Sequence, residues 1–341
     1  MSERLEDIAA AIVAGGKGLL AADESSGTIK KRFDVIGVES TADSRRDYRE
    51  MMFRAKDAMT KYISGVILYD ETIRQKAADG TPLVDIIKAA GAIPGIKVDL
   101  GAKPLAGFPG DTVTEGLDGL RERLADYYKL GARFAKWRAV IDIDTGKGVP
   151  STNSISANTH ALARYAALCQ EAGIVPIVEP EVLMDGAHDI GTCYEVSKAT
   201  LIKLYDELHA ARVVLEGTIL KPNMVLSGKK SGTVDSPEKV AEMTIKLFRE
   251  TVPAAVPGIA FLSGGQEDEE ATANLNAINA IGPHPWKLTF SYGRALQAAP
   301  QKAWSGKASN VAAGQAAFTH RAHMNYLAAL GKWKASLEQA A

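Results

Sequence analysis

Short apolar stretches recur along the chain, and each ends in a polar or charged cluster. The stretches are rich in β-branched residues, which predicts strands. There are eight of them: GKGLLAADE from Gly16, GVILYDE from Gly65, PGIKVD from Pro94, ARFAKWR from Ala132, IVPIVEPE from Ile174, LEGTILKPN from Leu215, GIAFLSGG from Gly258 and WKLTFSYGR from Trp286.

Longer segments with a helical period separate these strands. Examples are ADSRRDYREMMFRAKDAM, LDGLRERLADYYKLG, ANTHALARYAALCQEAG and SPEKVAEMTIKLFRE. In the last of these, Ser236, Pro237 and Glu238 form the cap, proline and acid that are typical of a helix start. The N-terminal segment also predicts an amphipathic helix, whose apolar face is formed by Leu5, Ile8, Ala9 and Ile12.

The alternation of strand and helix eight times over predicts parallel strands with helical crossovers. Eight such units that close on themselves form an α/β protein of the (β/α)8 TIM barrel type, a fold that commonly needs about 250 residues or more as one domain. We therefore expect residues 1–341 to form a single barrel domain with an N-terminal helix and a helical C-terminal end. The stretch SGKKSGTVDS from Ser227 is expected to be a loop, and it is too short to divide domains.

Composition narrows the class of ligand. The chain of 341 residues carries 40 Lys and Arg against 41 Asp and Glu, for a formal net charge of −1. Such a balance gives no global attraction to nucleic acid or to acidic membranes, so an anionic ligand must be bound by local groups. The acidic N-terminus lacks the features of a signal peptide, and no apolar run approaches the ~20 residues of a membrane span. We expect a cytoplasmic protein with no membrane partner.

Metal and disulfide chemistry have little support. Cys169 and Cys193 are the only cysteines and form no CxxC pair, so they are expected to be reduced thiols. The six histidines are scattered and show no ligand spacing such as HExxH. No metal and no cofactor are expected.

Charged and small polar residues stand where the predicted strands end. In a barrel of this kind the chemistry lies at the C-terminal ends of the strands. A buried unpaired charge costs several kcal/mol, so charges inside apolar strands indicate a shared polar site. These residues are Asp23, Lys97, Lys136, Arg138, Glu179, Glu181, Lys221, Ser263, Gly264, Gly265, Ser291, Gly293 and Arg294.

Lys221 is the candidate nucleophile. It follows an apolar strand and precedes Pro222, which removes a backbone donor and ends the strand. Burial and repulsion by nearby Lys136 favour the free amine, which attacks ketones to form an iminium. The structural alternative is a lysine that only pairs with Glu179 or Glu216.

Proton transfer needs further groups. Glu179 and Glu181 lie two apart on a strand and point to the same side, as do Lys136 and Arg138. We expect a cation to hold one carboxylate while the other keeps a raised pKa and acts as acid and base. The alternative is that both carboxylates only neutralise Lys136 and Arg138. Asp23 is a further candidate base, although it could instead cap a helix.

Two groups of residues suit phosphate. The backbone N–H groups of LSGG and SYGR, together with Arg294, can converge on an anion after the last two strands, a frequent phosphate position in this fold. A second group, expected across the barrel mouth, comprises Ser25, Thr28, Arg32 and Lys97. Two phosphate sites around an amine indicate a substrate that is phosphorylated at both ends.

The motifs ILKPNMV and IVPIVEPE, with KGLLAADESSGTIKKR, FAKWR, FLSGGQ and LTFSYGRALQ, resemble those of class I fructose-bisphosphate aldolases. The resemblance implies a barrel enzyme of glycolysis and gluconeogenesis, usually a homotetramer, that reversibly cleaves fructose 1,6-bisphosphate to dihydroxyacetone phosphate and glyceraldehyde 3-phosphate.

The resemblance also implies a role for each motif residue. Lys221 would form the Schiff base and Glu179 would assist carbinolamine dehydration. Asp23 would take the C4 hydroxyl proton, and Lys136 would assist imine formation. The C1 phosphate would lie on Ser263, Gly264, Gly265, Ser291, Gly293 and Arg294, and the C6 phosphate near Ser25, Thr28, Arg32, Lys97 and Arg138.

Two alternative functions remain open. One is a related Schiff-base aldolase that acts mainly on fructose 1-phosphate or sedoheptulose bisphosphate. The other is a non-enzymatic sugar-phosphate scaffold, which the presence of Lys221, Glu179 and Asp23 disfavours.

Overall fold

The computed structural model describes residues 3–339, so the first two and last two residues of the expected 1–341 domain lie outside the described part. Eight strands form a closed barrel in the order β1-β10-β9-β8-β7-β6-β3-β2, and every neighbouring pair is parallel. The strands are β1 (Gly18–Ala22), β2 (Ile63–Leu68), β3 (Ile93–Lys97), β6 (Phe134–Ile141), β7 (Val175–Val182), β8 (Ile219–Leu220), β9 (Gly258–Phe261) and β10 (Lys287–Tyr292). All eight predicted strands are present, and the (β/α)8 fold is confirmed.

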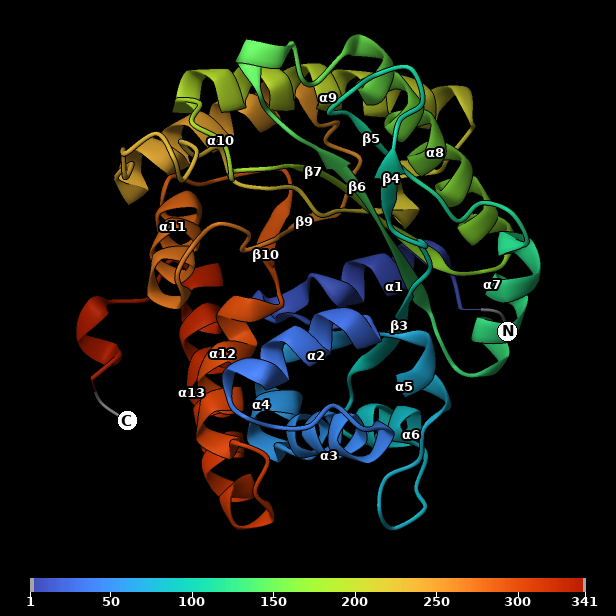
Figure 1. Cartoon of the computed structure of the whole chain (residues 1–341), viewed down its shortest axis with the longest axis vertical. Helices are drawn as coiled ribbons and strands as arrows, with labels where there is room; N and C mark the ends of the chain where they lie inside the picture. The colour runs from blue at the N-terminus through green and yellow to red at the C-terminus, as the bar shows by residue number, and fades with distance from the viewer. Residues whose placement is uncertain (1–2, 340–341) are drawn as a thin grey trace.

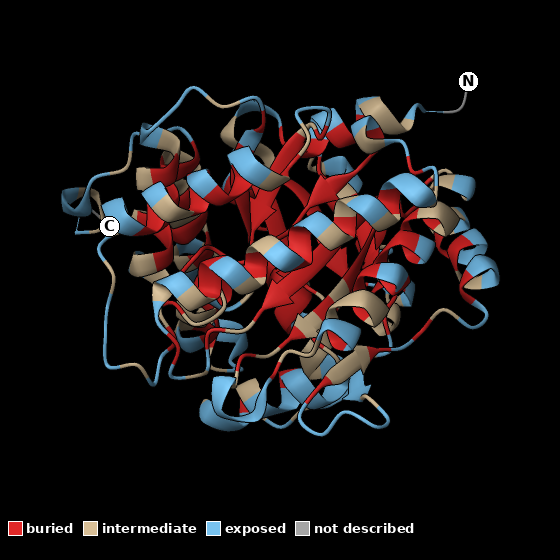
Figure 2. Cartoon of the chain, turned by 90° about the horizontal axis from the view of Figure 1, so that it is seen from above, coloured by how far each residue is buried: buried red, intermediate tan, exposed pale blue. Residues whose placement is uncertain are grey.

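Helices surround the barrel, and the views in Figures 1 and 2 place buried strands inside a shell whose outer face is exposed. The helices are α1 (Leu5–Ile12), α2 (Ser26–Val35), α3 (Ala42–Phe53), α4 (Lys56–Lys61), α5 (Asp70–Arg74), α6 (Leu83–Ala89), α7 (Leu120–Lys129), α8 (Thr152–Glu171), α9 (Ile190–Ala210), α10 (Pro237–Thr251), α11 (Asp268–Ala280), α12 (Arg294–Trp304) and α13 (Val311–Ala329). Ser236 caps α10 by accepting a hydrogen bond from the Lys239 N–H, as its sequence predicts. None of the helices in residues 3–339 combines the length and the apolar character needed to cross a membrane.

Helix α1 closes the N-terminal end of the barrel. Its residues Ile8, Ala9 and Ile12 are buried in one cluster with inward-facing strand residues such as Phe134 and Ile177. The helix also contacts the turn at Leu215–Gly217 that precedes β8. The site must therefore open at the opposite end, where the strands terminate.

Three local features differ from the expected elements. The helix expected from residue 42 to residue 59 is two helices, α3 and α4, separated at Arg54 and Ala55. The sixth barrel strand is only two residues long, because a 3₁₀ turn precedes it and Pro222 follows it. A short antiparallel hairpin, β4 (Ala102–Pro104) and β5 (Thr112–Thr114), lies between β3 and β6 and was not predicted.

Candidate active site

A cavity of about 440 Å³ opens at the C-terminal ends of the barrel strands. All sixteen candidate site residues from the sequence line it, although they come from segments that span most of the chain. Seven further residues line the cavity: Ala21, Glu24, Leu183, Met184, Asp185, Lys229 and Leu262. The barrel thus brings the two candidate phosphate groups and the candidate nucleophile to one place, and their chemical roles remain predictions.

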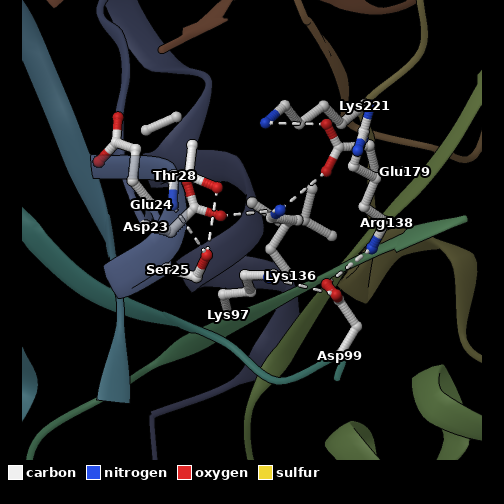
Figure 3. Close-up of polar contacts among 12 residues, drawn as sticks. Asp23, Glu24, Ser25, Thr28, Lys97, Asp99, Lys136, Arg138, Glu179 and Lys221 are labelled. Carbon is white, nitrogen blue, oxygen red and sulfur yellow. Dashed lines mark hydrogen bonds and ion pairs between the residues drawn. The ribbon is translucent and has the colours of Figure 1, made fainter. Parts of the chain in front are cut away.

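At the floor of the cavity, acidic and basic groups alternate (Figure 3). Lys221 Nζ lies 3.1 Å from Glu179 Oε1, and the other oxygen of this carboxylate lies 3.1 Å from Lys136 Nζ. Lys136 Nζ is also 2.8 Å from Asp23 Oδ2. Each of the four side chains is at most 14% exposed, so the charges interact with little screening by water.

The strands place these groups by register. Lys136 and Arg138 are two apart on β6, as are Glu179 and Glu181 on β7, and Arg138 pairs with Glu179 in the ladder. Side chains two apart point to the same face of a strand. The Lys221 N–H donates to the Val178 carbonyl at 2.8 Å, which holds the lysine against β7 although β8 has already ended.

The charge states follow from these distances. Burial on its own would raise the pKa of the Asp23 carboxyl, but Lys136 and then Lys221 outweigh burial and lower this pKa well below its ordinary value. Burial would likewise lower the pKa of Lys136, but Asp23 and Glu179 outweigh it and raise this pKa. Asp23 is therefore an ionised base, and Lys136 stays protonated.

The sequence left open which of the two carboxyls on β7 keeps a raised pKa, and the pKa of Glu179 is shifted the other way. Burial favours its neutral form, but Lys136 and Lys221 lie on either side of it and lower its pKa below the ordinary value. Glu181 forms an ion pair with Arg138, whose pKa is raised by this pairing in spite of burial. Both carboxylates are thus held by cations, and Glu179 is ionised before any substrate binds.

The segment after β9 has the geometry of an anion site. Gly265 has a φ of +81°, a conformation that favours glycine, and a Cβ there would lie 2.1 Å from Met184 Cγ. Ser291 on β10 is buried, and its hydroxyl has no hydrogen-bond partner among the described residues. Arg294 Nη2 donates to the Gln266 carbonyl at 2.6 Å, which fixes the guanidinium beside this segment. Backbone groups, a free hydroxyl and a cation thus converge here.

The second group of candidate residues begins at the start of α2. Ser25 caps this helix by accepting from the Thr28 N–H at 3.4 Å, and its Oγ lies 3.1 Å from Thr28 Oγ1. The capping residue is therefore Ser25 and not Asp23, which leaves the Asp23 carboxylate to Lys136. Lys97 Nζ lies 3.4 Å from Asp99 Oδ1.

Arg32 borders both groups. A Cβ on Gly293 would lie 3.7 Å from Arg32 Nη2, so the guanidinium also reaches the candidate anion site formed by the segments after β9 and β10. Arg32 Nη1 donates to Glu24 Oε1 at 2.5 Å, and Gln297 Nε2 donates to the same oxygen at 2.8 Å. Sequence reasoning missed Glu24, because a strand end and a helix start separate it from Arg32 and no periodicity links the two.

Within the described residues, no three histidine, cysteine, aspartate or glutamate side chains are arranged so that they could hold a metal ion.

Comparisons with known proteins agree with the motifs and the fold. A family model described as "Glycolytic: Fructose-bisphosphate aldolase class-I" matches residues 4–341. A probable class 1 fructose-bisphosphate aldolase of Xanthomonas axonopodis pv. citri is 58% identical over 333 residues, which cover 97% of this chain and 99% of the relative. The cytosolic fructose-bisphosphate aldolase 4 of Arabidopsis thaliana is 55% identical over 96% of this chain and 82% of its own length.

A solved structure gives the same result. The fructose-bisphosphate aldolase of Plasmodium falciparum, determined in complex with TRAP and a small-molecule inhibitor, superposes with a TM-score of 0.95. It shares 49% identity and is matched over 97% of this chain and 95% of its own. This chain belongs to the class I fructose-bisphosphate aldolase family.

Proposed function

We propose that this protein reversibly cleaves fructose 1,6-bisphosphate to dihydroxyacetone phosphate and glyceraldehyde 3-phosphate through a Schiff base on Lys221. The observation that carries the proposal is the alternating series of Lys221, Glu179, Lys136 and Asp23 at distances of 2.8 to 3.1 Å. This series supplies a nucleophile and two carboxylates in a cavity with an excess of basic side chains.

Imine formation begins with proton transfer from Lys221. Glu179 is ionised and lies within hydrogen-bond distance of the ammonium, so it accepts a proton and frees the amine. The amine attacks the C2 carbonyl carbon, and the attacking nitrogen passes one of its protons to the carbonyl oxygen, which becomes the carbinolamine hydroxyl and leaves a lone pair on the nitrogen. Glu179 then returns its proton to this hydroxyl, water leaves, and the nitrogen lone pair forms the iminium bond.

Carbon–carbon cleavage uses the other carboxylate. Asp23 accepts the proton of the C4 hydroxyl, the C3–C4 bond breaks, and its electron pair flows into the iminium to give an enamine. The aldehyde product leaves, and protonation at C3 followed by hydrolysis releases the ketone product. Lys136 remains a cation throughout, since it lies between Asp23 and Glu179 and keeps both carboxylates available as bases.

The two anion sites would orient the substrate. We assign the C1 phosphate to the segment at Ser263–Gly265 with Ser291, Gly293 and Arg294, and the C6 phosphate to Ser25, Thr28, Lys97 and Arg138. Arg32 would lie between them, because it reaches Gly293 from α2. The basic residues on the C6 side favour a bisphosphate over fructose 1-phosphate, and they do not distinguish six carbons from seven.

The decisive experiment is borohydride reduction in the presence of dihydroxyacetone phosphate, followed by peptide mapping. We expect one stable adduct, at Lys221, and no adduct in a Lys221→Ala variant that keeps the wild-type circular dichroism spectrum. An adduct on another residue, or full turnover in Lys221→Ala, would refute the mechanism.

We further propose a single-domain chain that assembles as a homotetramer in the cytoplasm. The tetramer is the usual state implied by the family resemblance, and the Arabidopsis relative is named as cytosolic. Sedimentation velocity tests the assembly, since a monomer of 36.3 kDa would contradict it.

A further inference from the structure

Seven basic side chains line the active-site cavity, and five of them are already engaged with carboxylates. Arg32 pairs with Glu24, Lys97 with Asp99, Arg138 with Glu181, and both Lys136 and Lys221 with Glu179. Within residues 3–339, Arg294 and Lys229 have no carboxylate within ion-pair distance. Arg294 belongs to the candidate anion site formed by the segments after β9 and β10, whereas the family motifs give Lys229 no role.

Lys229 lies in the loop of residues 227–236, which is held firmly at its base. Three consecutive backbone N–H groups of this loop donate to carbonyls of the segment that follows β7. Lys229 N–H donates to the Met184 carbonyl at 2.8 Å. On either side of it, Gly228 N–H donates to the His188 carbonyl at 2.8 Å and Lys230 N–H to the Gly186 carbonyl at 2.9 Å. Close packing reinforces this register, because a Cβ on Gly228 would lie 2.2 Å from the Gly186 carbonyl oxygen. The position of the Lys229 backbone is thus fixed although its side chain is exposed.

This anchor places Lys229 on one particular side of the cavity. Met184, which accepts the Lys229 N–H, packs directly on Gly265 of the anion site after β9. Lys229 and Gly265 also line a second hollow together, between the 227–236 loop and the start of α11. The next residue, Lys230, lines a different hollow with Asp142, Asp144 and His188, and it does not line the active-site cavity.

We propose that Lys229 is a specificity-determining residue that binds the phosphate held by the Ser263–Gly265 segment, in addition to Arg294. The inference rests on the proposed aldolase function and assigns this lysine to one end of the substrate. An uncommitted ammonium at the rim strengthens binding of a dianion by attraction that salt partly screens. The effect is confined to ligands that carry a phosphate at C1.

Condensation kinetics separate the two ends, because dihydroxyacetone phosphate carries the C1 phosphate and glyceraldehyde 3-phosphate carries the other. In Lys229→Gln we expect the KM for dihydroxyacetone phosphate to rise about two- to fivefold, the range of a partly exposed ion pair. The KM for glyceraldehyde 3-phosphate should stay unchanged. The rise should shrink as ionic strength increases, and Lys229→Arg should restore most of the affinity.

Lys230→Gln is the matched control, since it removes the same charge one residue away and should change neither KM. Equal effects in Lys229→Gln and Lys230→Gln would overturn the inference, as would a rise in the KM for glyceraldehyde 3-phosphate or no rise at all. These outcomes leave the aldolase assignment intact. If instead the wild-type protein neither condenses the two triose phosphates nor forms a borohydride adduct, the proposed function fails and this inference fails with it.

Discussion

Lys136 controls the charge of two carboxylates at once, since its ammonium contacts Asp23 at 2.8 Å and Glu179 at 3.1 Å. Replacing it with methionine removes the cation that acts most strongly on each of these buried carboxylates. Breaking a buried ion pair costs ~3–5 kcal/mol. The residual effect of burial is to raise the pKa of both groups. The loss of stability in Lys136→Met, relative to the wild-type protein, is therefore expected to be largest at neutral pH, where ionised carboxylates are favoured in water but costly to bury.

The sign of the pH dependence follows from the direction of each shift. In the wild-type protein, folding lowers the pKa of Asp23 from its ordinary value of 3.8. The ionised Asp23 therefore stabilises the folded protein above pH ~4, and this stabilisation is lost as the pH falls through the pKa of Asp23 in the folded state. In the variant, the raised pKa values make ionisation costly as the pH increases from about 4 to 7. The difference in melting temperature between the wild-type protein and Lys136→Met should therefore increase from pH ~4 to pH ~7. Lys61→Met, which breaks an exposed pair with Asp57, is the control and should show a small and constant difference. A Lys136→Met deficit that does not depend on pH would contradict this account.

Asp23 and Glu179 should be separable by the step that each one assists. Asp23→Asn removes the proposed base for carbon–carbon cleavage, so we expect turnover of fructose 1,6-bisphosphate to fall by about 10²- to 10⁴-fold. Glu179 and Lys221 remain in this variant, so borohydride should still trap dihydroxyacetone phosphate on Lys221. Loss of trapping together with turnover would show that Asp23 acts earlier in the reaction.

At the scale of residues, the sequence predicted which side chains line the cavity but not their protonation. Strand alternation and the known position of chemistry in barrels were sufficient to select thirteen of the sixteen candidates. The other three, Ser25, Thr28 and Arg32, came from the phosphate-binding group and the family resemblance, and they belong to helix α2 and its cap. The sign of the pKa shift at Glu179 depends on two cation distances, which no spacing in the sequence specifies. Lys229 was missed for a related reason, because its backbone anchor at Met184 exists only once the two loops have met.

At the scale of elements, β3 and β6 pack closely because β3 has a glycine, Gly95, where β6 places the ring of Phe134. Gly95 lies under the Phe134 ring, and a Cβ there would approach Phe134 Cε2 to 2.1 Å. Gly95→Ala should destabilise the protein by ~1–3 kcal/mol through overpacking, as measured by chemical denaturation. Gly191→Ala is a suitable control, because its Cβ would meet only an ordinary contact at 3.5 Å.

A second variant tests the cause. Shortening the ring in Phe134→Leu should relieve the clash, so the double variant Gly95→Ala/Phe134→Leu should lose less stability than the sum of the single losses. Additive losses would mean that the glycine is required for another reason.

The elements themselves were predictable to different extents. The eight barrel strands are buried on both faces and therefore read as apolar runs, which made them visible in the sequence. The β4–β5 hairpin was not visible, since its strands have three residues each, β4 is exposed, and one residue is a proline. Helix α3 ends at Phe53 with no glycine or proline to signal the break before α4.

For the whole molecule, closure of the barrel predicts cooperative behaviour. The first strand pairs with the last, at Leu19 with Ser291 and Leu20 with Tyr292, so no part of the sheet is complete without the rest. The four tryptophans, Trp137, Trp286, Trp304 and Trp333, lie in different parts of the chain. We expect urea unfolding followed by tryptophan fluorescence to coincide with unfolding followed by far-ultraviolet circular dichroism. Two separated transitions would instead indicate more than one folding unit.

The pairing of β1 with β10 also has a consequence for biosynthesis. Asp23 is among the first residues to leave the ribosome, and Arg294 is among the later ones, yet both line one cavity. A growing chain that has already exposed Lys221 still lacks the strand that closes the sheet beside β1. The proposed nucleophile therefore appears before the residues that are proposed to bind the C1 phosphate, and we expect the nascent polypeptide to turn over no substrate until its synthesis is nearly finished.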